Sequence, residues 1–348
     1  MVISVVEIWL KYGRTEIFAD LGDNARIEQP PKAKPDFSQN IQEALASLGG
    51  GELSLVVDYV AGIDGYDTIL RNLATQLSLH GTSLKDLKTW LAASLYNSGE
   101  VEGEIVVMVS SEVRSMGIEK VAAIGDGEPS EASILLAPSI FWGGDIVTPA
   151  SLLGKHGLGD PEVVISPVIG RGGYVAEVIV GKPHEIETRA REAVQAFSKF
   201  TVAPDFSILV LGGPGHPTDL CLSTSIPLIS SVDEALEDKV IIFPVECHRG
   251  LGPSQFVEQL VSGGGDSSTV HARWLSLWGE RAERNKICMV TALPSTLVEK
   301  LLGARQADTL DEAMTYAWRL KSKEAGVLVV RNVLGARLVL EEPRNGDK

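Results

Sequence analysis

Short apolar runs alternate with amphipathic segments through the second half of the chain, and this alternation is typical of an α/β protein with a parallel sheet. The runs are rich in β-branched residues, as buried parallel strands are. The segments between them have helical spacing and are bounded by capping residues, glycine or proline. The expected strands are 206–211, 239–245, 286–290 and 326–330, and the expected helices are 222–235, 253–262, 270–284, 295–302 and 309–323.

The first half has a weaker pattern that still predicts alternating strands and helices. One β-hairpin is expected at Lys11-Tyr-Gly-Arg14 and another at Gly170-Arg-Gly-Gly173. Residues 110–160 show little periodicity, and Phe141-Trp-Gly-Gly144 is expected to be an apolar loop that packs on the core or lines a pocket. The expected strands are 3–10, 15–19, 53–57, 105–109, 133–136, 163–168 and 174–180, and the expected helices are 37–48, 66–79, 83–94 and 183–200.

A short linker, Thr201-Val-Ala-Pro204, separates the two halves. We therefore expect an N-terminal α/β domain of residues 1–200 and a C-terminal Rossmann-like α/β domain of residues 201–348. The last apolar segment, 333–340, is placed to add a final strand to the first domain. The predicted fold class is α/β, with two α/β domains, mostly parallel sheets and an interdomain cleft.

The first loop that could carry chemistry follows the predicted strand 206–211. Open α/β sheets bind ligands at the carboxyl ends of their strands, and a glycine-rich turn before a helix can hold an anion. Gly212, Gly213, His216 and Asp219 are therefore candidates for ligand binding. The alternative is a tight strand-to-helix connection, and glycine is suited to both roles.

The second such loop, Glu246-Cys-His-Arg-Gly-Leu-Gly252, follows the predicted strand 239–245. Glu246, Arg249 and Gly250 are candidates for ligand binding, and the alternative is that Glu246 and Arg249 serve as a cap and an ion-pair partner. Cys247 next to His248 raises the hypothesis of a thiol enzyme. An inert buried thiol is the competing interpretation, because cysteine is among the most buried residue types.

Two further polar residues are candidates elsewhere in the chain. Asp58 ends the predicted strand 53–57, where a carboxylate could bind a ligand or cap a helix. His156 is a weak candidate for a metal ligand, because no histidine pair has the spacing that places two ligands on one helix face. The sequence therefore predicts no defined metal site.

The formal net charge of −15 argues against a nucleic-acid partner, because no basic run offsets it. Three widely spaced cysteines give neither a disulfide framework nor a paired metal motif. The N-terminus lacks the features of a signal peptide, and no apolar run reaches the ~20 residues that cross a bilayer. We expect a cytoplasmic protein with a small-molecule ligand, with no membrane partner, and compatible with a homo-oligomer.

The chain resembles the nickel-dependent lactate racemase family over most of the chain's length. The resemblance rests on several segments and on their order along the chain. The most specific match is Glu246-Cys-His-Arg-Gly-Leu-Gly252 with its preceding valine. The other matching segments are 6–13, 163–187, 205–219 and 310–330. The resemblance implies two α/β domains with a cleft, a nickel pincer nucleotide cofactor, and hydride abstraction from the α-carbon of a 2-hydroxy acid.

In that family, two histidines act as bases, a lysine tethers the cofactor and another histidine ligates nickel. At the matching positions this chain keeps Asp58, but Ala61 replaces an arginine and Pro227 replaces the lysine that contacts the substrate in that family. The catalytic residues therefore stay unassigned. One hypothesis is a 2-hydroxy-acid racemase or isomerase with a nickel pincer cofactor, and the alternative is a non-catalytic ligand-binding or assembly protein that keeps the scaffold only.

Overall fold

The computed structural model describes residues 6–28, 31, 37–46, 48, 52–60, 63–79, 83–91, 133–156, 159–263 and 269–341. The chain divides into two compact units, one formed by Met1–Pro30 with Lys199–Lys348 and the other by Pro31–Ser198. The division after Ser198 lies close to the predicted boundary. The first segment, however, belongs to the unit that contains the C-terminal half, because its apolar side chains complete that unit's core.

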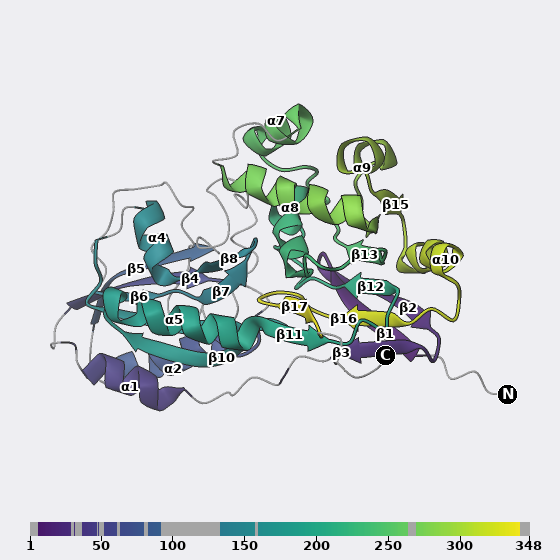
Figure 1. The fold of residues 1–348 in the computed structure, drawn as a ribbon. Coiled ribbons are helices and arrows are strands. Elements are labelled where there is room, and N and C mark those ends of the chain that lie inside the picture. The colour runs from purple at the N-terminus through teal and green to yellow at the C-terminus, as the bar shows by residue number, and fades with distance from the viewer. Residues whose placement is uncertain are drawn as a thin grey trace. The chain divides into compact units, whose positions relative to one another are not determined.

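A six-stranded parallel sheet forms the centre of the unit that contains the C-terminal half (Figure 1). The strand order is β15-β14-β13-β12-β16-β3, so β12 and β13 are neighbours and their carboxyl ends lie at one edge. This arrangement confirms the predicted parallel sheet. The strands are β3 (Ala25–Glu28), β12 (Ile208–Leu211), β13 (Val240–Pro244), β14 (Lys286–Val290), β15 (Arg305–Ala307) and β16 (Val327–Val330).

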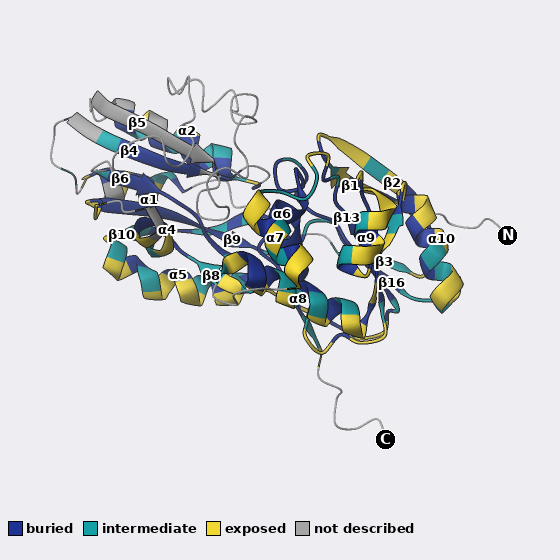
Figure 2. Ribbon diagram, turned by 90° about the horizontal axis from the view of Figure 1, so that it is seen from above, coloured by how far each residue is buried: buried dark blue, intermediate teal, exposed yellow. Residues whose placement is uncertain are grey.

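Helices cover this sheet, and their outward faces are exposed (Figure 2). The predicted helix 222–235 is wrong in its length: a short α6 (Leu222–Ser225) passes into a 3-10 helix, η2 (Ile226–Ser231). Pro227 explains the change, because it cannot donate the backbone hydrogen bond that an α-helix needs there. The other helices are α7 (Ser254–Ser262), α8 (Val270–Arg284), α9 (Ser295–Leu302) and α10 (Leu310–Lys321).

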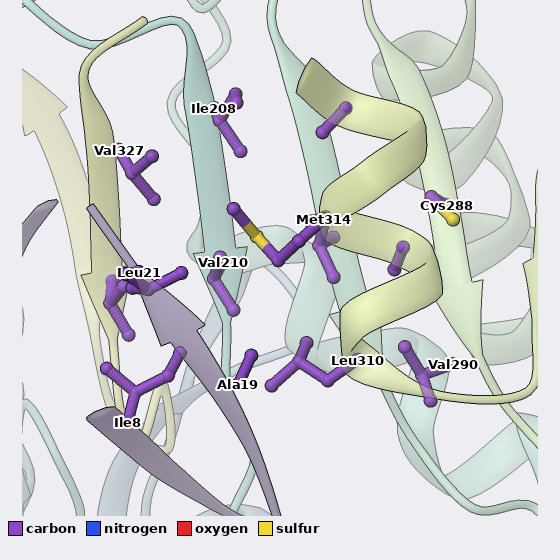
Figure 3. Close-up of a cluster of buried hydrophobic side chains, with 14 of the residues drawn as sticks. Ile8, Ala19, Leu21, Ile208, Val210, Cys288, Val290, Leu310, Met314 and Val327 are labelled. Atoms are coloured by element: carbon purple, nitrogen blue, oxygen red, sulfur yellow. The ribbon is translucent and has the colours of Figure 1, made fainter. Parts of the chain in front are cut away.

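The hairpin of β1 (Val6–Tyr12) and β2 (Thr15–Leu21) packs into the same core. Alternation along each strand points Ile8, Leu10, Ala19 and Leu21 inward, where they join side chains from the central strands and from α10 (Figure 3). A separate parallel pair, β11 (Lys199–Val202) with β17 (Arg337–Leu340), lies in this unit too. The predicted last strand therefore exists, but it pairs with the segment expected to be a linker.

The unit Pro31–Ser198 has its own seven-stranded sheet, in the order β5-β4-β6-β9-β7-β8 with β10 paired to β9. Helix α5 packs on β9, β10 and β7, and buries Ile186, Ala190 and Val194. The strands are β4 (Glu52–Tyr59), β5 (Ser83–Leu91), β6 (Ile134–Leu136), β7 (Ser139–Trp142), β8 (Asp145–Val147), β9 (Val163–Gly170) and β10 (Tyr174–Gly181). The helices are α1 (Ser38–Ala46), α2 (Tyr66–Leu79), α4 (Pro149–His156) and α5 (Pro183–Ser198).

Two predictions for this unit are wrong. The expected helix 83–94 is the strand β5, because pairing with β4 along its length overrides local helical spacing. The expected loop Phe141–Gly144 is a hairpin of β7 and β8, whose turn uses two glycines with positive φ, Gly143 and Gly144. The expected strand 105–109 lies outside the described residues. In the part of the chain that is described, no helix is long and apolar enough to cross a membrane.

Candidate active site at the carboxyl edge of β12 and β13

Three segments of one unit meet at the carboxyl edge of β12 and β13. They are the tip of the β1–β2 hairpin, the loop 212–219 and the turn 246–252. The backbone N–H of Gly13 donates to Asp219 Oδ2 at 2.6 Å, and the N–H of His216 donates to the carbonyl of Gly13 at 2.9 Å. The N–H of Cys247 donates to the carbonyl of Asp219 at 2.7 Å. These bonds fix the hairpin tip and both predicted loops against one another.

Gly13 is required at the hairpin tip for both its conformation and its lack of a side chain. Its φ is +54°, a region that favours glycine, and a Cβ there would lie 1.9 Å from Glu246 Oε2. The backbone of Gly13 therefore lies directly against the Glu246 carboxylate. Since Gly13 also contacts Asp219 and His216, it places two acidic side chains and a histidine around a single residue.

The turn after β13 presents a carboxylate–imidazole pair. His248 Nδ1 lies 2.9 Å from Glu246 Oε2, and the two side chains are 38% and 29% exposed. A carboxylate only accepts hydrogen bonds, so the pair is satisfied when Nδ1 carries the proton and Nε2 is left as an acceptor. The His216 ring stacks on the His248 ring with centroids 6.4 Å apart. A carboxylate that orients an imidazole in this way is one of the arrangements that general acid–base catalysis uses.

Asp219 lies behind this pair and is almost fully buried. Burial raises the pKa of its carboxyl group, and the charge of Glu246 adds to this effect, while the backbone hydrogen bonds from Gly13 and Glu246 oppose it. Burial also raises the pKa of Tyr12, with Glu246 as the next largest cause, so its phenol stays protonated. Asp219 therefore supports the hairpin tip, and Glu246 is the carboxylate that contacts solvent.

Cys247 is not a nucleophile in this arrangement. Its side chain is 1% exposed, its sulfur lies 3.6 Å from Ser225 Oγ, and burial raises the pKa of the thiol. The structure therefore supports the inert buried thiol and gives the thiol-enzyme hypothesis no support.

The glycines of the two loops differ in their surroundings. Gly212 is enclosed, since a Cβ there would lie 2.3 Å from the carbonyl oxygen of Arg331, and its own N–H and carbonyl bond to Val330 and Val333. Gly213 lies against Leu228 and is buried. Gly250 has φ +87° with open space around it. Gly212 and Gly213 are therefore needed for close packing, as in a tight strand-to-helix connection. Gly250 instead allows the turn in which its neighbours are exposed.

Arg249 lies in the same turn and is exposed, and its N–H donates to the carbonyl of Leu220 at 2.9 Å. The structure thus brings six of the predicted residues together with Gly250: Gly212, Gly213, His216, Asp219, Glu246 and Arg249. It adds His248, which the sequence suggested only as a partner of Cys247, and Gly13 and Tyr12, which the sequence suggested only as part of a hairpin turn. The spacing of two between Glu246 and His248 was the signal that could have identified the pair.

Two predicted residues belong to the other unit. Asp58 is fully buried in β4, and its carbonyl accepts a hydrogen bond from the Tyr66 hydroxyl. His156 is the last residue of α4, and its side chain is not among the described ones. No group of three or more histidine, cysteine, aspartate or glutamate side chains that could hold a metal ion occurs among the described residues.

The same unit has an open hollow of about 850 Å³ at the start of α5, which no predicted site residue lines. Its rim mixes exposed acidic and basic side chains, among them Glu43, Asp160, Lys182 and Arg189. No described residue of the loops after β12 and β13 lines it. We therefore place the candidate site at the edge of β12 and β13.

Comparison with solved structures decides the fold. A lactate racemase apoprotein from Thermoanaerobacterium thermosaccharolyticum superposes with a TM-score of 0.60 and 16% sequence identity, over 97% of this chain and 100% of that one. The chain has the lactate racemase fold. A protein from Thermotoga maritima also matches, with a TM-score of 0.55 and 12% identity over 89% of this chain and 100% of that one. No protein-family model and no curated protein sequence matches this chain.

The lactate racemase fold confirms the predicted fold class and the resemblance drawn from Glu246–Gly252. At 16% identity it speaks for the architecture alone. Any activity must therefore be argued from the residues at the carboxyl edge of β12 and β13.

Proposed function

We propose that this protein is an isomerase of a small 2-hydroxy acid, and that the turn 246–252 holds its proton-transfer site. The observation that carries the proposal is the Glu246–His248 pair, 2.9 Å apart at the carboxyl edge of a parallel sheet. Two features support it. Parallel α/β sheets bind ligands at this edge, and the fold is shared with a lactate racemase apoprotein.

In this proposal His248 acts on the substrate hydroxyl group. Glu246 accepts the hydrogen bond from Nδ1–H and so orients the imidazole, and Nε2 takes the hydroxyl proton. The protonated imidazole is stabilised by the Glu246 carboxylate and returns the proton to the same oxygen. The guanidinium of Arg249, in the same turn, binds the substrate carboxylate.

In the family that the sequence resembles, a lysine tethers the nickel pincer nucleotide and a histidine ligates its metal, and the resemblance carries neither role onto a described residue of this chain. The lysine that contacts the substrate in that family is replaced by Pro227, which is buried in η2. Inversion needs an acceptor for the hydride of the substrate carbon, and a bound pincer nucleotide would supply it. The residues of the turn act only on the hydroxyl proton and the carboxylate of the substrate.

A racemisation assay tests the proposal. The purified protein is incubated with L-lactate, L-malate or D-glycerate, and both enantiomers are measured by chiral chromatography, alongside the metal content of the protein. We expect inversion of one of these acids, and a loss of about 100-fold or more in kcat for His248→Ala, as for a general acid–base residue. His184→Ala is the matched control, because His184 is an exposed histidine in the other unit.

The same measurements distinguish an isomerase from the alternative, a non-catalytic ligand-binding protein. Saturable binding of a 2-hydroxy acid that Arg249→Gln weakens, without inversion of any substrate, would show a ligand-binding protein on the same scaffold. Turnover that His248→Ala leaves unchanged would overturn the assignment of the proton-transfer site.

A further inference from the structure

A second pocket lies away from the Glu246–His248 pair, between β14, β15 and α10 of the same unit. It has a volume of about 300 Å³, and Cys288, Arg305, Glu312, Thr315, Tyr316 and Arg319 line it. This volume is at the small end for ligand sites, so it suits a molecule of a few heavy atoms and excludes a nucleotide. The residues come from three elements that lie close together in the sequence, β14, β15 and α10.

The wall formed by Cys288 is neutral. Cys288 lies on β14 beside α10 (Figure 3), and its side chain is fully buried. Burial raises the pKa of the thiol to about 12, with Glu312 adding to the shift and Arg305 opposing it. The sulfur therefore keeps its proton at neutral pH and neither repels an anion nor acts as a nucleophile.

The polar lining is dominated by cations. Arg305 on β15 and Arg319 on α10 contribute two guanidinium groups, which are always charged. Arg305 contacts Glu299 at 3.4 Å, but both side chains are about half exposed, and such a surface pair contributes ~1 kcal/mol or less. An anion in the pocket can therefore replace this contact.

The one carboxylate of the lining is already used by the chain. Glu312 Oε2 accepts the backbone N–H of Asp308 at 2.9 Å, and the N–H of Glu312 donates to Thr309 Oγ1 at 3.1 Å. Thr309 thus caps α10, and the Glu312 side chain returns to the backbone of Asp308, the residue before the cap. Two arginines against one engaged glutamate leave the lining positive, in a chain whose net charge is −15.

The remaining polar groups can donate hydrogen bonds. Burial, followed by Cys288, raises the pKa of Tyr316, while Arg305 opposes the shift, so the phenol keeps its proton. Thr315 adds a second hydroxyl group. Two guanidinium groups and two hydroxyl groups in so small a pocket are the donor set of an oxyanion site.

We infer that this pocket binds a small oxyanion, a phosphate or a short dicarboxylate, between Arg305 and Arg319. The guanidinium groups hold two of its oxygens, and Thr315 and Tyr316 donate to the others. Because the pocket is separate from the Glu246–His248 pair, the inference does not depend on the proposed isomerase activity.

Calorimetric titration of the full chain with inorganic phosphate and, separately, with malonate tests the inference. We expect one saturable site for one of the two anions, and a 10-fold or larger rise in Kd for Arg305→Gln and for Arg319→Gln, since each loses a charge-assisted contact. Arg337→Gln, which removes an exposed arginine of the same unit on β17, should leave the Kd unchanged. His248→Ala should leave it unchanged as well.

Two results would overturn the inference. One is the absence of saturation by either anion up to about 10 mM, a concentration that would still reveal a millimolar Kd. The other is equal weakening by Arg337→Gln, which would mean that the anion responds only to the overall charge. Tyr316→Phe provides a further check, because it keeps the packing and should raise the Kd by a few fold.

Discussion

The two loops at the neighbouring carboxyl ends of β12 and β13 differ in what they leave accessible. In the loop 212–219 the glycines are enclosed, and Asp219 is buried with its carboxylate bonded to the hairpin tip. In the turn 246–252, His248 and Arg249 are exposed and Glu246 is half-buried beside them. The first loop supports the structure, and the second presents reactive groups.

This difference shows that a glycine-rich turn in the sequence does not by itself indicate a ligand-binding loop. Both loops have glycines at the position where α/β sheets bind ligands, and composition alone does not separate them. The separation comes from contacts distant in sequence, such as that of Gly212 with Arg331 and that of Gly13 with Glu246. The following predictions test the contrast between the supporting loop and the reactive turn.

The largest expected effect is on stability, from Gly212→Ala. A Cβ at this position would meet the backbone oxygen of Arg331 at 2.3 Å and Leu10 at 3.1 Å, so we expect a loss of about 3 kcal/mol in the free energy of unfolding. Denaturant-induced unfolding measures it. Gly250→Ala is the contrasting variant, because it has a φ of +87° but open space, and it should cost about 1 kcal/mol. Equal losses would remove the distinction between the two loops.

The next effect is on turnover, from Glu246→Gln. The amide keeps the shape of the side chain but no longer stabilises a protonated His248, so we expect a loss of about 10-fold in kcat for the acid that the protein inverts. Because the pair is partly exposed, the free energy of unfolding should change by less than about 1 kcal/mol. Steady-state kinetics and unfolding curves measure both. A kcat equal to that of the unsubstituted protein would show that Glu246 does not assist His248.

A smaller effect is expected on the pH dependence of stability, from Asp219→Asn. Burial raises the pKa of Asp219 in the folded state, so the folded protein holds this proton more tightly than the unfolded chain. The free energy of unfolding therefore increases as the pH falls from 7 through the pKa of Asp219 in the folded state. The increase is complete below the pKa in the unfolded chain, about 3.9. Unfolding curves from pH 7 to 4 should show this gain in the unsubstituted protein relative to the variant. The opposite difference would mean that hydrogen bonds outweigh burial at Asp219.

The last prediction is that the Cys247 thiol does not react with an alkylating reagent in the native protein. Iodoacetamide should not modify this thiol in the native protein, because the side chain is buried and protonated, and should modify it once the protein is unfolded. Mass spectrometry of the labelled peptides gives the result. Rapid native labelling of Cys247 would restore the thiol hypothesis.

Much of the fold could be predicted from local patterns. The helices 66–79, 270–284 and 295–302 and the strand 286–290 have the predicted bounds, because their apolar spacing and their bounding residues agree. Segments whose structure depends on distant partners could not be predicted in this way. The strand β5 exists because β4 lies beside it, β3 because β16 does, and β11 because β17 does.

The candidate site was predicted in part for the same reason. Neighbouring strands in the sequence pattern placed the loops 212–219 and 246–252 at one sheet edge, which the pairing of β12 with β13 confirms. The contribution of the hairpin tip depends on Gly13, which lies over two hundred positions from Asp219 in the sequence and yet donates to it at 2.6 Å. No local pattern carries that contact.

The most direct test of the account is an NMR titration of the histidine-labelled protein with a 2-hydroxy acid, because it reports binding at the Glu246–His248 pair without requiring turnover. The imidazole signals of His248 should shift and saturate on addition of the acid, those of the stacked His216 should shift less, and those of His184 should stay in place. Unmoved His248 signals with lactate, malate and glycerate alike would contradict the assignment of the site to the turn 246–252.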